Sequence, residues 1–162
     1  MRIFIASPLG FYESGRLLLP ILCERLRDLG VTPVNPWDAS QDLEQKLREA
    51  QAIPDPEARR RNLHAASMQI AERNASLLQS CDGVLAVLDG CDVDSGTASE
   101  IGFAFGLGNK IIHGFRSDFR RSGENDGVHI NLQVEYWIEK SGGKIVFSLE
   151  ELNQLPFTKK DQ

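Results

Sequence analysis

Four carboxylates cluster near the middle of the chain. Residues 83–88 read GVLAVL, an apolar run typical of a strand that is covered on both faces, and Asp89, Asp92, Asp94 and Glu100 lie within the next twelve residues. Carboxylates that crowd together repel one another, which costs free energy unless the cluster has a use. We therefore take this cluster as the first candidate for a site of chemistry.

The sequence allows two interpretations of Glu100. Residues 97–100 read TASE, which matches a capping box, in which Thr97 begins a helix and Glu100 binds the backbone of its first turn with no catalytic role. Alternatively, Ser95 and Gly96 provide a small, flexible approach where a ligand can lie close to the backbone. A carboxylate in the first turn of a helix also stays ionised, as a nucleophile must.

The surrounding sequence predicts strands that alternate with helices. Strands are expected at residues 2–7, 31–34, 83–88, 110–115 and 144–147. Helices are expected at residues 17–29, 42–52, 58–80, 97–107, 131–141 and from 148 onward. Because crossovers between parallel strands are right-handed, this order predicts an α/β fold with a five-stranded parallel sheet and helices on both faces.

In an open α/β sheet, ligands bind beyond the carboxyl ends of the strands. That rule selects the loops at residues 7–12, 35–38, 89–100 and 116–131. Trp37 and Asp38 follow the second predicted strand, where an indole can stack on a planar ring of a ligand and a carboxylate can bind an amino group. The arginines of the last loop, Arg116, Arg120 and Arg121, could bind phosphate or pair with nearby acids.

Composition narrows the class of protein. The 162 residues carry 18 Lys plus Arg and 23 Asp plus Glu, a net charge of −5, which argues against nucleic acid or an anionic membrane as a partner. The length predicts one domain over residues 1–162, and the lack of a signal-peptide core or apolar span predicts a cytoplasmic protein. Three widely spaced cysteines fit neither a disulfide framework nor a zinc site, and we expect no metal or cofactor.

The sequence resembles the nucleoside 2-deoxyribosyltransferase family from about residue 3 to residue 147. The motifs that carry the resemblance are IASP at residues 5–8, LDG at 88–90, DVDSGTASEIG at 92–102, RSDFR at 116–120 and NLQ at 131–133. The resemblance implies a flavodoxin-like domain that cleaves the N-glycosidic bond of a 2′-deoxynucleoside and transfers the sugar to another base, such as a purine. In this family a glutamate forms a covalent deoxyribosyl ester, and two inversions give net retention.

The same resemblance assigns roles to individual residues. Glu100 matches the nucleophile, and Asp94 matches the carboxylate that binds the sugar hydroxyls, above all the 5′-OH. Asn131 matches an asparagine donated to a neighbouring subunit's site, which implies a homo-oligomer, and Gln133 falls near it at a base or sugar edge. Gly96 and Ser7 lie in the matching substrate-binding loops.

The sequence departs from the family at two positions. Phe4 stands where the family commonly has a tyrosine whose hydroxyl orients the nucleophile, and Tyr12 is the nearest substitute. Asn74 matches the residue that faces the base, and an amide can bind a base edge but cannot protonate a leaving purine. Two alternatives to the transferase stay open: an N-glycosidase acting on deoxynucleosides or their 5′-monophosphates, and a non-catalytic nucleotide-binding module.

Overall fold

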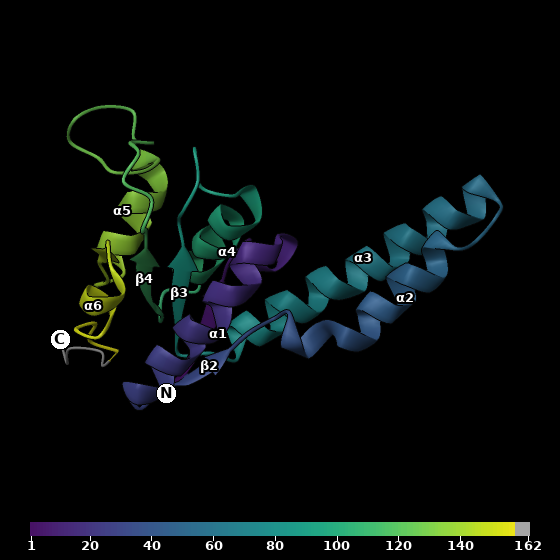
Figure 1. Cartoon of the computed structure of the whole chain (residues 1–162), viewed down its shortest axis with the longest axis horizontal. Coiled ribbons are helices and arrows are strands. Elements are labelled where there is room, and N and C mark those ends of the chain that lie inside the picture. Colours follow the sequence, from purple (N-terminus) through teal and green to yellow (C-terminus); the bar gives the residue numbers. More distant parts are fainter. Residues whose placement is uncertain (158–162) are drawn as a thin grey trace.

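The computed structural model describes residues 1–157 and is built on a five-stranded parallel sheet (Figure 1). The strands are β1 (Arg2–Ala6), β2 (Thr32–Val34), β3 (Gly83–Val87), β4 (Ile111–Phe115) and β5 (Ile145–Val146). They lie in the order β2-β1-β3-β4-β5, and every neighbouring pair is parallel. This confirms the predicted flavodoxin-like α/β fold, whose strand order reverses between β1 and β3, the place where such folds bind ligands.

Helices cover both faces of the sheet. Helices α1 (Glu13–Asp28) and α6 (Leu149–Leu152) pack on one face, and α4 (Ser95–Gly106), α5 (Leu132–Lys140) and the end of α3 (Pro56–Gln79) pack on the other. Side chains of β1 alternate between these layers: Ile3 and Ile5 pack with α1, whereas Phe4 and Ala6 pack with α4. All of β3 and β4 is buried, as expected of central parallel strands.

Helices α2 (Gln41–Gln51) and α3 form a two-helix arm that projects beyond the sheet (Figure 1). An ion pair between Asp42 and Arg73 joins the two helices, and Lys46 Nζ donates to Gln69 Oε1 at 2.9 Å. Arg73 also donates to the carbonyl of Ala39 at 2.8 Å, which fixes the start of the arm to the loop that follows β2. The base of this arm therefore lies beside the carboxyl edge of the sheet.

Candidate active site

A cavity of about 280 Å³ opens at the carboxyl edge, between the sheet and the base of the arm. One wall comes from the loop after β1 and the first turns of α4, and the other from the loop after β2 and the helices of the arm. The lining residues are Ser7, Phe11, Pro36, Trp37, Ser40, Glu44, Leu47, Ile70, Asn74, Asp94, Gly96, Thr97 and Glu100. The structure thus brings together residues that are far apart in the sequence, including six of the predicted site residues.

Glu100 is the sixth residue of α4, and its carboxyl group lines the cavity. Burial, followed by the negative charge of Asp94, raises the pKa of Glu100 to about 7. Burial and the charge of Asp94 thus oppose the expected effect of the helix N-terminus, because Glu100 lies beyond the first turn of α4, where that effect fades. A carboxyl group with a pKa near neutrality in a cavity is typical of functional sites.

The capping-box interpretation of residues 97–100 is also wrong. The helix begins two residues earlier than Thr97, and its N-cap is Asp94, whose Oδ2 accepts from the backbone N–H of Thr97 at 2.9 Å. The Thr97 hydroxyl lies 3.3 Å from the same oxygen, and Thr97 is buried inside the helix. Glu100 therefore has no capping role, and Asp94, not Thr97, is the N-cap residue of α4.

Asp94 lines the cavity, and the cap of α4 uses only one of its two carboxylate oxygens. Its Oδ2 is used by the cap, but among residues 1–157 no group donates to its Oδ1. Tyr12, one loop away, has a raised pKa because of burial and the nearby charges of Asp89 and Asp94. Tyr12 therefore lies near this carboxylate, although it is half exposed and does not line the cavity.

At the arm side of the cavity, two buried oxygens have no hydrogen-bond partner within the described part of the chain. They are Oδ1 of Asn74, on α3, and Oγ of Ser40, at the N-cap of α2. An unpartnered buried polar atom costs free energy, so these two atoms mark a place that a polar ligand can complete. Sequence reasoning predicted Asn74 but missed Ser40.

The sequence analysis also did not predict Glu44, Leu47 and Ile70 as site residues. Ser40, Glu44 and Leu47 follow one another at a spacing of four and three residues, and Ile70 precedes Asn74 by four. This spacing places each set on one face of its helix. The spacing was present in the sequence, but nothing in the sequence showed that the base of the arm lies beside the carboxyl edge of the sheet.

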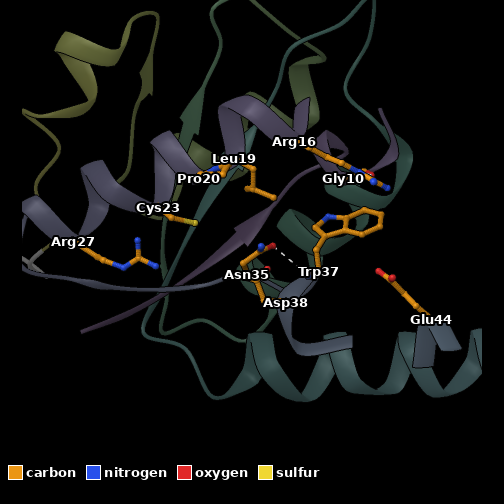
Figure 2. A pocket seen from close by; sticks show the side chains of 10 residues that line it. All are labelled: Gly10, Arg16, Leu19, Pro20, Cys23, Arg27, Asn35, Trp37, Asp38 and Glu44. Carbon is orange, nitrogen blue, oxygen red and sulfur yellow. Dashed lines mark hydrogen bonds between the residues drawn. The ribbon is translucent and has the colours of Figure 1, made fainter. Parts of the chain in front are cut away.

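Trp37 separates this cavity from a second one, of about 360 Å³, between α1 and the loop that follows β2 (Figure 2). The indole lies against Gly10, where a Cβ atom would come within 2.2 Å of the ring, and its edge packs on Phe11. Asp38 lines the second cavity and not the one that contains Glu100. Glu44 and Trp37 line both.

The remaining predicted residues lie as follows. Ser7 lines the cavity with Glu100, and its hydroxyl accepts from the backbone N–H of Leu9 at 3.0 Å. Phe4 is fully buried in the core between the sheet and α4. Asn131 is the N-cap of α5, and neither it nor Gln133 lines the cavity of this chain.

The arginines of the loop between β4 and α5 are all engaged. Arg116 is buried and donates to the carbonyl oxygens of Leu88, Gly90 (3.2 Å) and Arg120 (2.6 Å). The side chain of Arg120 forms an ion pair with Asp118, which holds the pKa of that carboxyl well below its usual range, and Arg121 pairs with Asp126. Arg116 therefore fixes the backbone of this edge and is not available to a phosphate.

Residues 1–157 contain no group of three or more His, Cys, Asp or Glu side chains placed to hold a metal ion. In this same part of the chain, none of the helices has both the length and the hydropathy needed to cross a bilayer.

Comparison with known proteins identifies the family of this chain. A family model described as nucleoside 2-deoxyribosyltransferase matches residues 3–133. "Uncharacterized protein C191.05c" of Schizosaccharomyces pombe is 30% identical over 122 residues, which are 73% of this chain and 51% of that protein, so the chain spans about half the length of the curated relative it matches.

Two solved structures share the fold of this chain. A conserved protein of Enterococcus faecalis V583 has 26% identity and a TM-score of 0.68 over 96% of both chains. A 2-deoxyribosyltransferase of Bacillus psychrosaccharolyticus shares the fold, with 20% identity and a TM-score of 0.64 over 97% of this chain and 93% of that one. With more than half of its residues matched by the family model, this chain belongs to the nucleoside 2-deoxyribosyltransferase family.

Proposed function

We propose that this protein is a nucleoside 2-deoxyribosyltransferase that moves 2-deoxyribose from one nucleobase to another, with Glu100 as the nucleophile. The observation that carries the proposal is the Glu100 carboxyl group, which lines a cavity of about 280 Å³ and has a pKa raised to about 7. A carboxylate that has lost hydration is a better nucleophile than one in water, and it regains stability when it forms an ester.

The reaction that we propose, as the family resemblance implies, has two displacements. One Oε of Glu100 bonds to C1′ of the sugar while the bond from C1′ to the base nitrogen breaks, and the electron pair leaves with the base, which takes a proton from solvent. A nitrogen of the second base then attacks C1′, releases Glu100 as a carboxylate and loses its own proton. Each step inverts C1′, so the nucleoside retains its configuration.

Other lining residues have supporting roles in this proposal. The Oδ1 atom of Asp94 accepts a hydrogen bond from the sugar, with the 5′-OH as its partner, while Oδ2 keeps α4 capped. The base lies at the arm side, where Trp37 offers an aromatic surface and Asn74 a buried amide. Because an amide does not protonate a leaving base, we assign that proton to water.

Asn131 enters the proposal through a second copy of the chain. Its side-chain oxygen Oδ1 caps α5, and its Nδ2 donates to Glu124 Oε1 at 3.0 Å, outside the cavity. We propose that it completes the site of a neighbouring subunit, as the family resemblance implies. Sedimentation velocity should then show a dimer or a multiple of one, whereas full activity of a monomer at high dilution would contradict this assignment.

One assay tests the function. The protein is incubated with deoxyinosine alone and with deoxyinosine plus adenine, and products are separated by chromatography. A transferase produces deoxyadenosine in the second reaction. Hypoxanthine and free deoxyribose in both reactions, with no deoxyadenosine, would identify a hydrolase, and no product in either would favour a binding module.

A further inference from the structure

Glu44 lies at the boundary of the two cavities and has no role in the chemistry at C1′. It projects from the first turns of α2, and Figure 2 shows its carboxylate turned from the helix toward Trp37. Asp94 and Glu100 line only the first cavity, whereas Glu44 and Trp37 line both. The carboxylate of Glu44 therefore lies on the side of the cavity that the proposed function assigns to the base.

We infer that Glu44 selects the base, and that the preferred base is guanine. This inference rests on the proposed function, because it takes the arm side of the cavity as the base site. Guanine presents two adjacent donors on one edge, the ring N1–H and the 2-amino group, and a carboxylate accepts from such a pair with both oxygens.

The other bases meet Glu44 less well. Adenine and cytosine place an unprotonated ring nitrogen beside their amino group, so one carboxylate oxygen would face a lone pair and be repelled. Hypoxanthine keeps the ring N1–H but lacks the 2-amino group, and it offers one donor where guanine offers two. A base that lacks one of these donors forms one hydrogen bond fewer with Glu44.

The surroundings of Glu44 also favour a ligand rich in donors. Within residues 1–157, Ser40 Oγ and Asn74 Oδ1 are buried without partners, and both can accept. Together with Glu44 they give this side of the cavity an excess of acceptor oxygens, and no Lys or Arg lines it. A ligand with several N–H groups satisfies them.

Glu44 is available for this contact. Its contact with a cation is to Arg48 Nη1, 3.7 Å from its Oε2, and both side chains are well exposed, at 65% for Arg48 and 43% for Glu44. Such a pair between exposed groups on one helix is weak. A base can therefore recruit the carboxylate at little cost.

The test compares deoxyguanosine with deoxyinosine, which differ only in the 2-amino group. We expect wild-type kcat/KM, with adenine as acceptor, to favour deoxyguanosine about tenfold or more, the equivalent of about 1.4 kcal/mol. Glu44→Gln replaces one acceptor oxygen by a donor and should bring the ratio close to one. Glu49→Gln is the matched control, since Glu49 is an exposed residue of α2 that lines neither cavity, and it should leave the ratio unchanged.

Equilibrium binding of both nucleosides to Glu100→Gln protein separates this inference from the proposed function. A preference for deoxyguanosine that Glu44→Gln removes supports the inference even if the wild-type protein shows no transfer. Transfer with equal kcat/KM for both nucleosides, or a preference that survives Glu44→Gln, overturns the inference and leaves the proposed function intact.

Discussion

Two charged loops lie side by side at the carboxyl edge of the sheet and differ in how their charges are satisfied. The loop after β4 carries more charged residues, yet Arg116, Arg120 and Arg121 all have partners within it or in the neighbouring backbone. The segment after β3 contains Asp94, with an oxygen that receives no hydrogen bond from any described group, and Glu100, with a raised pKa. The number of charges therefore does not locate the site, whereas an incompletely satisfied charge beside a cavity does.

The largest expected difference between the two loops is in activity. Glu100→Ala should lower kcat by several orders of magnitude, because it removes the nucleophile. Asp118→Asn, a carboxylate change in the neighbouring loop, should leave kcat within about twofold, since Asp118 pairs with Arg120 and does not line the cavity. Initial rates measure both values of kcat. Equal losses in the two variants would contradict the assignment of the site to the segment after β3.

Stability should respond in the opposite sense. Arg116→Met leaves three backbone carbonyls without their buried donor and should lower the free energy of unfolding by about 3 kcal/mol or more, because charge-assisted hydrogen bonds in a buried site are expensive to lose. Arg120→Met removes an ion pair whose guanidinium is largely exposed to solvent, so the free energy of unfolding should change much less than for Arg116→Met. Urea denaturation measures both, and a similar cost for the two would show that Arg116 does not fix this edge.

Asp94 should determine how the site treats the 5′ end of the substrate. A 5′-phosphate would meet like-charge repulsion from Asp94, so deoxyinosine should have a higher kcat/KM than its 5′-monophosphate. Asp94→Ser keeps an N-cap residue for α4 but removes the charge, and should narrow this gap about tenfold. Equal values in the wild-type protein would mean that Asp94 does not face the 5′ position.

The smallest expected effect is a pH-dependent gain in stability. Folding raises the pKa of Glu100 from 4.5 to about 7, so its favourable contribution is complete below about pH 4.5 and is lost as the pH rises through 7. Glu100→Gln should therefore raise the free energy of unfolding at pH 8 by about 1–2 kcal/mol and change it little at pH 5. Denaturation at both pH values checks this, and a stability loss at pH 8 would mean that the charge is well stabilised.

Local patterns predicted the sheet well, because its strands are short apolar runs between clear turn residues. The start of α4 was misplaced because residues 94–97 and 97–100 both carry a capping pattern, and only packing decides between them. The site was predicted on the sheet side, where the loop rule applies, through Ser7, Asp94 and Glu100. On the arm side, Trp37 and Asn74 were predicted, but Ser40, Glu44 and Leu47 were missed. Their place in the site depends on how α2 and α3 dock, which no short-range pattern encodes.

The covalent intermediate tests the central claim most directly. The wild-type protein is mixed with deoxyinosine without an acceptor base, quenched in acid, digested and analysed by mass spectrometry. We predict that the peptide containing Glu100 gains the mass of one deoxyribosyl group, that adenine added before the quench removes it, and that Glu100→Gln protein is never labelled. Turnover without label, or label on a different residue, would contradict the assignment of Glu100 as the nucleophile.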